Sequence, residues 1–578
     1  MPGLRHHRST VALATVAVGL AVATASTASA APRDLSSHRK NRVAIQLLAF
    51  NDFHGHLEPD TGRGRLVAAD NRRVETNGVA YLARHLKNLR RGQKHSLTVA
   101  AGDLIGKSTF TSGLFHDEPA VETLDEIGLD VSSVGNHEFD EGVTELLRIQ
   151  NGGCHPVDGC FQQDAAGNDI GYPGADFRYL AANVVHRRTG KTVLPATWVK
   201  KVGGVKLGFI GMTFEDSGRL IAPGAIVGYD FLDAVRAGNR AAKMLQKKNG
   251  VKAIVVLLHE GGLQSGSYNG CAGIAGPIVD IAQRLAPKID AVISGHTHAA
   301  YACKIRDPKG NFRSVTSADS FGRTVTEINL KIDTHTGDVV RKSVKAVNQL
   351  VTRDVRQDRA TRAIVRKWVA KAAGPGNRVV GTISEDIRRS PDHGVESSLA
   401  NLIADAQRAS TGAQVAFMNP EAIEASLLVD RSLAGEQPGQ ITYREAYNVQ
   451  PYGNFLQTFD MTGAQIEMLL EQQWIRRGGD VLRLGISDGL TYSWSPSAPV
   501  GSKIDPASIT LNGVAIEPAA TYRVAANNYI ATGGNGFTAF ANGAPRTGGK
   551  VDLVALTDYF TANPNVGAPP AARSTSTA

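Results

Sequence analysis

Five segments of this 578-residue chain end in side chains that can bind metal ions. Each segment is an apolar, partly β-branched run of the kind that forms a buried strand, and Asp, Asn or His follows it. In chain order the candidate ligands are Asp52, His54, Asp103, Asn136, His259, His296 and His298. A single histidine after a strand is more often structural than functional. Five such endings, with no cysteine among the candidates, indicate a site for hard or borderline cations.

Seven candidate ligands are more than one ion requires. If one carboxylate is shared, they form two sites, and the bridged ions lie about 3.5–4 Å apart. Ligands of these types without thiolate suit Zn²⁺, Mn²⁺, Co²⁺ or iron, so we expect two divalent ions, with Zn²⁺, Mn²⁺ and Co²⁺ as the first candidates. Such a pair polarises a phosphoryl oxygen and makes hydroxide from water near neutral pH, which predicts hydrolysis of a phosphoester.

The segment GNHEFD also contains a candidate proton-transfer pair. Asp140 lies three residues after His137, so a helical turn would bring its carboxylate back towards the imidazole. There it would hold one tautomer and leave the other ring nitrogen for a transition-state oxygen or a leaving group. The alternative is that Asp140 only caps the turn. No candidate serine or cysteine nucleophile adjoins the site, so no covalent intermediate is needed.

The stretches before these residues predict an open α/β sheet. Residues 43–50, 96–101 and 251–258 have the composition of buried strands, and such sheets bind ligands at the carboxyl ends of their strands. Helical stretches at 78–92 and 233–248 alternate with the strands. This α/β alternation extends over residues 43–347 and defines a first domain.

A second domain is expected because single cores stop growing near about 250–300 residues. Residues 354–373 lack Gly and Pro and carry an apolar stripe at helical spacing. They predict a linking helix that stops at Gly374-Pro375-Gly376. The second domain spans 378–560 and opens with a strand and then a helix at 397–410.

Two Gly-rich turns of the second domain stand beside Tyr452 and Tyr529. Such turns let backbone and aromatic faces approach a ligand, although a tyrosine in a turn is usually packing. Residues 564–578 are rich in Pro, Ala, Ser and Thr, and this composition predicts a disordered tail.

The first 30 residues predict a secretory signal peptide. Arg5 and Arg8 precede an apolar run, and Ala28-Ser29-Ala30 supplies small residues at the cleavage positions. The alternative is an uncleaved anchor, but the run is shorter than the about 20 residues that a span needs. Loss of the two arginines lowers the formal charge from +9 to +7. We therefore expect a secreted protein without a membrane span after cleavage, and the scattered basic residues predict no nucleic-acid partner.

The four cysteines fit an oxidising compartment. Cys154 and Cys160 lie in a Gly- and Pro-containing loop that could close a short disulfide, which leaves Cys271 to pair with Cys303. A zinc knot is the alternative, but this spacing without a nearby matching CxxC suits it poorly.

At these motifs the chain resembles the calcineurin-like metallophosphoesterases. Their signature is the series DxH, GD, GNH(E/D), H and GHxH, and here it reads Asp52-Phe53-His54, Gly102-Asp103, Gly135-Asn136-His137-Glu138, His259 and Gly295-His296-Thr297-His298. NDFHGHLEP, GDLIGKS, GNHEFDEG, NLIADA and GGNGF are also similar to the secreted 5′-nucleotidase family, which includes UDP-sugar hydrolases. The resemblance implies an α/β protein with a four-layer αββα metallophosphoesterase domain, a linking helix and a second α/β (α+β) domain for substrate specificity.

The resemblance also assigns each ligand to an ion. One ion would take Asp52, His54, Asp103 and His298, and the other would take Asp103, Asn136, His259 and His296. His137 and Asp140 would form the catalytic dyad. Some relatives have Asn or Gln at the position of His298, a difference that should alter metal preference more than mechanism.

A nucleotide pocket in the second domain is implied as well. A nucleobase would stack between Tyr452 and Tyr529, and Asn535, where relatives often have Asp, would lie near the ribose. Relatives carry N-x-G-G-I-R, whose arginine grips the substrate phosphate, whereas this chain reads Asn419-Pro420-Glu421-Ala422-Ile423-Glu424. Asn419 remains, but Glu424 replaces the arginine. A carboxylate there would repel a phosphate by on the order of a few kcal/mol.

The sequence therefore predicts an exported two-metal phosphoester hydrolase that removes phosphate from nucleotides. The enzyme alternatives are a 2′,3′-cyclic-nucleotide phosphodiesterase and a UDP-sugar hydrolase. A secreted nucleotide-binding protein with weak turnover is the alternative of another class, and the complete ligand set argues against it. The expected partner is a small-molecule nucleotide; the preferred nucleotide and the oligomeric state do not follow from the sequence.

Overall fold

The computed structural model of the chain describes residues 41–60, 65–68, 71–221, 223–475 and 481–577. The predicted signal peptide at 1–30 lies outside these residues. Among the described residues, none of the helices is both long and apolar enough to cross a bilayer.

The first domain contains two six-stranded sheets. In spatial order the first sheet comprises β18 (Lys345–Leu350), β17 (Thr324–Asp333), β1 (Arg42–Phe50), β4 (Ser96–Ala101), β5 (Val131–Ser133) and β8 (Arg178–Leu180). The second comprises β10 (Thr197–Val202), β11 (Val205–Thr213), β13 (Ala253–His259), β14 (Ala291–Ser294), β16 (Phe312–Ala318) and β15 (Ala300–Arg306). Because β18 runs to Leu350, the first sheet extends slightly beyond the predicted end at 347.

Strand β1 illustrates why the two sheets pack face to face. Its Leu47 and Ala49 belong to the apolar core that the sheets share, whereas Leu48 and Phe50 pack on the helix side. Successive side chains of a strand point to opposite faces, so a strand buried on both faces needs a continuous apolar run. Each fully buried Leu or Phe contributes roughly 1.5–3 kcal/mol.

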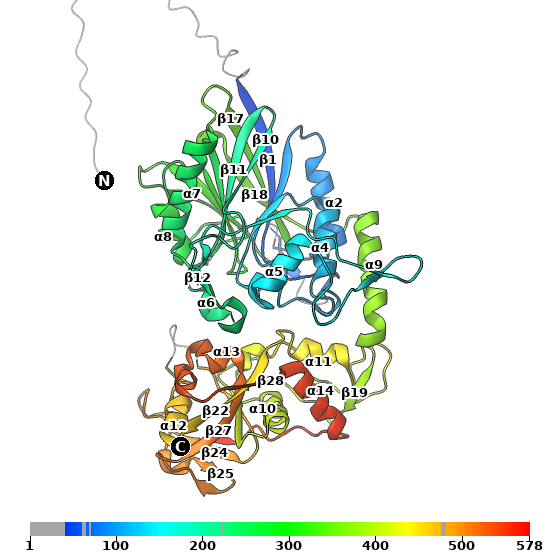
Figure 1. The fold of residues 1–578 in the computed structure, drawn as a ribbon, viewed down its shortest axis with the longest axis vertical. Helices are drawn as coiled ribbons and strands as arrows, with labels where there is room; N and C mark the ends of the chain where they lie inside the picture. The colour runs from blue at the N-terminus through cyan, green and yellow to red at the C-terminus, as the bar shows by residue number, and fades with distance from the viewer. Residues whose placement is uncertain (1–40, 61–64, 69–70, 222, 476–480, 578) are drawn as a thin grey trace, which may run out of the picture. The chain divides into compact units, whose positions relative to one another are not determined.

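Helices cover the outer face of each sheet (Figure 1). Helices α2 (Val79–Arg90), α4 (Glu118–Glu126) and α5 (Gly142–Asn151) pack on the first sheet, and α7 (Ala234–Asn249) and α8 (Pro277–Arg284) pack on the second. The domain therefore has the predicted αββα layers.

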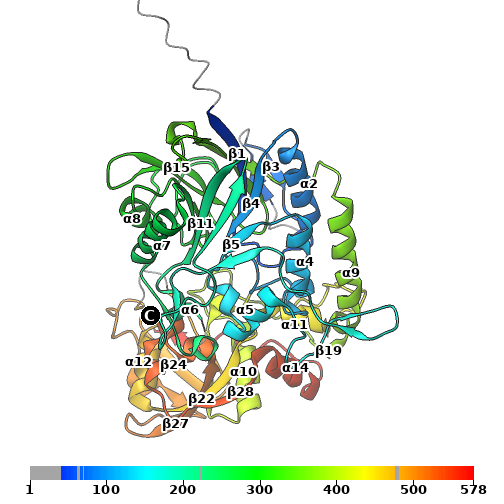
Figure 2. The same cartoon turned by 45° about the horizontal axis from the view of Figure 1, so that its top comes forward.

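Helix α9 (Arg359–Gly376) links the two domains and lies beside α2 and α4 (Figure 2). It begins where the Asp358 side chain accepts the N–H of Thr361. The predicted helix, 354–373, starts too early and stops too soon. Pro375 lies inside the last turn, and the helix continues through it to Gly376. Trp368 is buried, and its Nε1–H donates to Glu122 of α4 at 2.6 Å.

The second domain is built on a five-stranded sheet. Its strands are, in order, β23 (Gly485–Ile486), β20 (Val415–Met418), β27 (Thr521–Asn527), β22 (Phe455–Thr462) and β28 (Thr547–Val551). Helices α10 (Ser398–Thr411) and α14 (Asp552–Ala562) contribute to the core on one face, and α12 (Gly463–Glu471) contributes to the core on the other. The predicted opening strand and helix correspond to β19 (Val379–Thr382) and α10.

A second sheet of this domain orders the end of the chain. It comprises β26 (Val514–Ala515), β25 (Thr510–Leu511), β24 (Leu490–Trp494) and β29 (Ser574–Ser576). Strand β29 pairs in parallel with β24, and the guanidinium of Arg573 donates to both carboxylate oxygens of Asp405 at 2.8 and 2.9 Å. The predicted disordered tail at 564–578 is therefore wrong for its described residues, because composition alone does not reveal a buried ion pair.

The remaining elements are short. They are β2 (Arg65–Val67), β3 (Arg73–Glu75), β6 (Gln162–Gln163), β7 (Asp169–Ile170), β9 (Val184–His186), β12 (Tyr229–Phe231), β21 (Gln440–Thr442), α3 (Phe110–Gly113), α6 (Ser217–Leu220), α11 (Tyr443–Val449), α13 (Asn528–Ala531) and the 3₁₀ turns η1 (His137–Phe139), η2 (Pro223–Ile226), η3 (Arg341–Ser343), η4 (Pro420–Ala422), η5 (Pro506–Ser508), η6 (Gly534–Gly536) and η7 (Thr538–Asn542).

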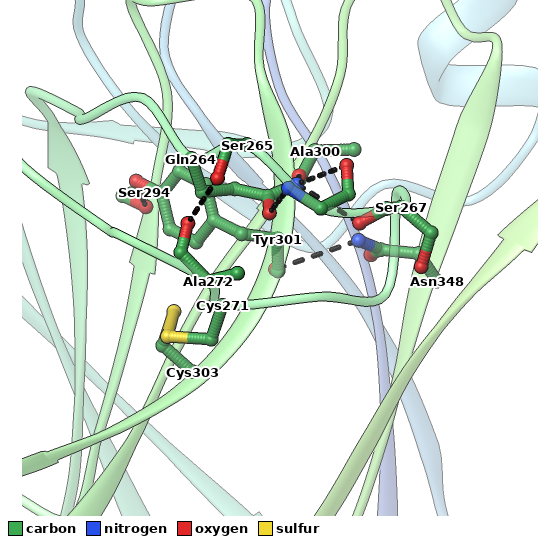
Figure 3. The surroundings of a disulfide bond; sticks show 11 residues. Gln264, Ser265, Ser267, Cys271, Ala272, Ser294, Ala300, Tyr301, Cys303 and Asn348 are labelled. Carbon is green, nitrogen blue, oxygen red and sulfur yellow. Dashed lines mark hydrogen bonds between the residues drawn. A yellow bond between two sulfur atoms is a disulfide. The ribbon is translucent and has the colours of Figure 1, made fainter.

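Both predicted disulfides are present: Cys154–Cys160 and Cys271–Cys303. Figure 3 shows the second, which joins the loop after β13 to β15. The side-chain amide of Gln264 also holds this loop, since it donates to the carbonyl oxygens of Ser267 and Ala300 at 2.9 and 3.1 Å. This loop follows His259, and β15 begins two residues after His298. The disulfide thus braces two segments that carry candidate ligands.

Candidate metal centre and substrate cavity

Six of the seven candidate ligands form two compact groups at the carboxyl ends of the central strands. Asp52, His54 and His298 make up one group, and Asp103, His259 and His296 make up the other; within each group the ligand atoms lie within 4.8 Å of one another. The carboxylate of Asp103 connects the groups, because its Oδ2 lies 2.9 Å from His259 Nε2 and 3.7 Å from His54 Nε2. Ligands from distant parts of the chain therefore converge on a shared carboxylate.

The backbone at these strand ends is unusual. Asp52, His54, Asp103, His296 and His298 all adopt positive φ, between 49° and 73°. This region is sparsely populated by residues other than glycine, and such conformations concentrate at functional sites. The turns are also tightly packed.

Gly135 lies so close to Asp103 that no other residue fits at this position. A Cβ on Gly135 would lie 2.1 Å from the Oδ1 of Asp103, a distance that no side chain tolerates. The glycine of the GNH motif therefore lets the third strand end pass directly beside the shared carboxylate.

Backbone carbonyls orient two of the imidazoles. His54 Nδ1 lies 2.8 Å from the carbonyl oxygen of Gly106, and His259 Nδ1 lies 2.8 Å from that of Ala101. A carbonyl can only accept, so each Nδ1 carries the proton and each Nε2 presents its lone pair to the centre. The carboxylate of Asp52 accepts the backbone N–H of His296 with both oxygens at 3.0 Å, which fixes its orientation.

Glu138 is a supporting residue that sequence reasoning did not single out. Its buried carboxylate accepts the backbone N–H groups of Asp103 at 2.9 Å and Leu104 at 2.7 Å, and also that of Gly135. It thus holds the GD turn against the GNH turn. Its only signal in the sequence is its place in the GNHE motif.

The electrostatics of the centre favour a bound cation. Burial alone would raise the pKa of Asp103, but His259 and His137 hold it well below its usual range. Burial would likewise lower the pKa of His259, but Asp103 raises it to about 10. Two buried carboxylates among histidines therefore require positive charge.

Two unpaired polar atoms point the same way. Within the described part of the chain, His259 Nε2 and Asn136 Oδ1 are buried and make no hydrogen bond, although the former is only 2.9 Å from Asp103 Oδ2. Buried polar atoms are normally hydrogen-bonded, and an imidazole nitrogen and an amide oxygen left without hydrogen bonds beside a carboxylate suit a metal ion. Asn136 also lines the adjoining cavity.

The candidate dyad is in contact. His137 Nδ1 lies 2.8 Å from Asp140 Oδ2 across the turn η1, and the His137 backbone N–H donates to Asp103 Oδ1 at 2.9 Å. The Asp140 side chain thus engages the imidazole, as the dyad interpretation requires. Burial lowers and Asp140 raises the pKa of His137, with a net rise to about 9.

A cavity of about 840 Å³ opens beside the dyad. The first domain contributes Asn136, His137 and Asp140, and the second contributes the four predicted substrate residues Asn419, Tyr452, Tyr529 and Asn535. Its wall also includes residues that sequence reasoning missed: Lys107, Arg389, His393 and Phe455. Phe455 lies in no motif, and the residue is 57% exposed.

A chain of amides fixes the far wall. Asn527 donates to Asn419 at 2.9 Å, Asn419 donates to Asn535 at 2.8 Å, and Asn535 donates to Glu421. The backbone N–H of Asn535 also donates to the Tyr529 hydroxyl at 3.3 Å. Glu421, one of the departures in the N-x-G-G-I-R stretch, therefore positions the amide of Asn535.

Glu424 is not an isolated carboxylate. Its Oε1 lies 2.9 Å from Lys107 Nζ and accepts the Tyr452 hydroxyl at 2.6 Å. The expected repulsion of a phosphate is therefore smaller than the sequence suggests, because a lysine from the first domain neutralises this charge.

Known proteins match the chain along both domains. The calcineurin-like phosphoesterase family model matches residues 45–300, and that of the 5′-nucleotidase C-terminal domain matches residues 379–542. Endonuclease YhcR of Bacillus subtilis is 32% identical over 87% of this chain and 39% of its own length. Cell wall protein Lmo0130 of Listeria monocytogenes is 31% identical over 86% of this chain and 64% of its own. The chain thus spans less than two thirds of either relative.

A solved structure covers the whole two-domain arrangement. The 5′-nucleotidase precursor from Thermus thermophilus is 26% identical, has a TM-score of 0.66, and aligns with 92% of this chain and 99% of its own. The two family models match successive parts of the chain, in the order of its two domains. The chain therefore belongs to the family of calcineurin-like phosphoesterases that carry a 5′-nucleotidase C-terminal domain.

Proposed function

We propose that this protein is an exported two-metal phosphoester hydrolase that removes phosphate from nucleotides. The observation that carries the proposal is the position of Asp103. Its carboxylate is within 4 Å of imidazoles from both ligand groups and accepts the backbone N–H of His137, which lines the cavity. Asp103 thereby connects the metal ligands to the dyad, and the dyad lines the substrate cavity.

The donor set fits two divalent ions. Asp52, His54, Asp103 and His298 would hold one, and Asp103, Asn136, His259 and His296 the other. Nitrogen and oxygen donors without thiolate favour Zn²⁺, Mn²⁺ or Co²⁺. When bound, such a pair would supply Lewis acidity towards a phosphoryl oxygen and activate water near neutral pH.

The residues of the chain supply the remaining functions. Asp140 accepts the Nδ1–H of His137, which leaves Nε2 to stabilise or protonate the departing oxygen. Tyr452 and Tyr529 would bind the nucleobase by stacking, with Asn535 near the ribose. Export is supported by two disulfides, which persist in oxidising compartments, and by the relative Lmo0130, which is named a cell wall protein.

Three other substrates warrant a test. The carboxylate of Glu424 in the cavity disfavours the doubly charged phosphate of a monoester. A 2′,3′-cyclic nucleotide or a UDP-sugar, whose phosphates each carry a single charge, would be repelled less. YhcR is named an endonuclease, so a DNA oligonucleotide is also a relevant substrate. A nucleotide-binding protein with weak turnover is the alternative without catalysis.

The test is a phosphate-release panel with AMP, ADP, UDP-glucose, 2′,3′-cyclic AMP, an aryl phosphate and a DNA oligonucleotide. Each reaction is run with Mn²⁺, Co²⁺ or Zn²⁺ and, separately, with a chelator. The products of the cyclic nucleotide, UDP-glucose and DNA are also resolved by chromatography, because these substrates can be cleaved without releasing phosphate. We expect chelator-sensitive turnover that Asp103→Ala abolishes, since loss of the shared carboxylate should disable both ion sites. Binding of AMP with no turnover of any substrate under all metals would favour the binding protein instead.

A further inference from the structure

A second cluster of metal-binding side chains lies apart from the catalytic centre. His116, Glu141, Glu145 and His155 place one ligand atom each within 4.8 Å of one another. Three segments supply them: the loop between α3 and α4, the first turns of α5, and the loop closed by Cys154–Cys160. The function proposed above uses none of these four residues.

The donor atoms face one another in an ordered way. His116 Nδ1 lies 2.5 Å from Glu141 Oε2, and His155 Nε2 lies 4.0 Å from both Glu141 Oε2 and Glu145 Oε2. The last two distances are too long for hydrogen bonds. They are compatible with ligands that share one ion, because two bonds of about 2.0–2.2 Å can span about 4 Å.

The two imidazoles are stacked. Their ring centroids are 3.7 Å apart and their planes differ by 10°. Two imidazolium cations would repel strongly at this distance, so the stack requires at least one neutral ring, and neutral imidazole is the form that binds metals.

Asp158 faces the opposite edges of both rings. Its Oδ2 lies 2.8 Å from His116 Nε2 and 3.6 Å from His155 Nδ1. In metal sites a carboxylate commonly accepts the second ring N–H of a ligating histidine and fixes its tautomer. The cluster therefore contains both the ligands and the residue that would orient two of them.

We propose that His116, Glu141, Glu145 and His155 form a third divalent-metal site, with Asp158 as the carboxylate that orients both imidazoles. Two nitrogen and two carboxylate donors suit Zn²⁺, Co²⁺ or Mn²⁺. The bound ion would hold the disulfide loop against the start of α5. It would also fix Glu141, which lines the substrate cavity next to Asp140.

Binding requires the loss of one proton and one tautomer change. Both ring nitrogens of His116 face carboxylates, Nδ1 that of Glu141 and Nε2 that of Asp158, so the metal-free ring carries two protons and an ion must displace the one on Nδ1. The backbone N–H of Asp158 donates to His155 Nδ1 at 3.0 Å, which puts the proton of the neutral ring on Nε2. For Nε2 to bind an ion, this proton must move to Nδ1, where the Asp158 carboxylate accepts it. The imidazole region of a ¹⁵N NMR spectrum should therefore report the exchange when Zn²⁺ is added.

The test counts ions in protein whose catalytic centre is disabled. Asp103→Ala protein is stripped with chelator, reloaded with Zn²⁺ alone, desalted and measured by elemental analysis. We expect one ion more per chain than in the same protein with the additional change His155→Ala. Glu145→Gln should weaken Zn²⁺ binding at least about tenfold. The control His335→Ala, on an exposed hairpin, should leave the zinc content per chain unchanged.

Thermal unfolding provides a second measurement. Zn²⁺ should raise the unfolding midpoint of Asp103→Ala protein, and His155→Ala or Glu145→Gln should remove that increase. If His155→Ala disturbs folding by circular dichroism, His155→Gln, which keeps a polar side chain of similar size, decides the result. Equal zinc content in Asp103→Ala protein with and without these changes would overturn the proposal. This outcome is independent of catalysis, because the background is inactive by design.

Discussion

Lys107 of the first domain and Glu424 of the second form an ion pair, with Nζ 2.9 Å from Oε1. The ammonium of Lys107 also lies 5.1 Å from the centroid of the Tyr452 ring, whose hydroxyl donates to the same carboxylate. The family resemblance places an arginine at position 424. In this chain the positive charge comes instead from Lys107 of the first domain, and it is paired with the carboxylate of Glu424, which stands in place of that arginine.

Removal of the negative charge should free Lys107 for a substrate phosphate. We expect Glu424→Gln to lower KM for AMP by about 3- to 10-fold, the scale of a partly exposed ion pair. Glu424→Arg should lower it too, because it restores the charge of the family pattern. Initial-rate kinetics on metal-loaded enzyme measure the effect.

The matched control is Glu517→Gln, an exposed glutamate away from the cavity. A double-mutant cycle adds specificity: in Lys107→Met protein, Glu424→Gln should no longer lower KM by the same factor. An unchanged or raised KM in both Glu424 variants would show that this carboxylate does not limit phosphate binding.

The contact between His137 and Asp140 yields a second prediction. Asp140→Asn keeps the shape but cannot hold the same imidazole tautomer, so kcat should fall by about 10²- to 10⁴-fold. Metal content should stay unchanged, because Asp140 is not among the proposed ligands. Steady-state kinetics and elemental analysis separate the two effects. A kcat within twofold of wild type would reduce Asp140 to a structural residue.

Some of this architecture is readable from the sequence because it depends on local pattern. Strand β1 is a continuous apolar run, since it is buried on both faces, and its end is marked by Asp52 and His54. The same pairing of apolar run and polar end recurs at Asp103 and His259. Parallel strands align their carboxyl ends, so the sequence predicts that ligands distant along the chain meet.

Contacts between distant polar side chains leave no such pattern. Lys107 belongs to the GDLIGKS motif, but its partner, Glu424, lies in the other domain, and no periodicity connects the two residues. Glu138 appears as a motif letter, while its role in binding three backbone N–H groups follows only from the packing of two turns. Arg573 lies in a stretch whose composition predicts disorder, and only its buried partner explains the order.

Nucleobase stacking predicts a selective effect on nucleotide substrates. Tyr529→Ala should raise KM for AMP by about 5- to 100-fold, since a base stacked on an aromatic ring contributes about 1–3 kcal/mol. KM for ribose 5-phosphate, which has no base, should change little. Tyr529→Phe is the control that keeps the ring. Equal losses for the two substrates would mean that Tyr529 shapes the cavity without contacting the base.

A buried carboxyl should make stability depend on pH. Burial raises the pKa of Asp552 to about 7, above the usual range of an aspartate. A raised pKa in the folded state means that stability is fully present below the unfolded pKa, near 4, and is lost as pH rises through about 7. Asp552→Asn should abolish this loss, and at pH 8 it should stabilise the protein by about 1–4 kcal/mol.

Urea unfolding of metal-free protein between pH 4 and 8 checks this prediction. The two proteins should have similar midpoints at pH 4, where Asp552 is protonated and resembles asparagine. They should diverge as pH increases, with the variant more stable. If the unfolding midpoints of the two proteins differed by the same amount at every pH, Asp552 would be ionised in the folded protein over the whole range. Asp558→Asn, at an exposed position of the same helix, controls for a general loss of negative charge.

The ion pair between Arg573 and Asp405 predicts that the last residues contribute to folding. Arg573 is 8% exposed, and it also donates to the carbonyl oxygen of Ile486 at 2.6 Å. Arg573→Met would leave the Asp405 carboxylate buried without its cation, which should destabilise the second domain by about 3–5 kcal/mol in urea unfolding.

Asp405→Leu in the same protein should recover much of that loss, because a buried ion pair can be replaced by apolar groups at little cost. Arg362→Met, at an exposed position of α9, should have almost no effect. A loss below about 1 kcal/mol for Arg573→Met is the value expected of a solvent-exposed pair, and it would mean that β29 detaches freely from β24.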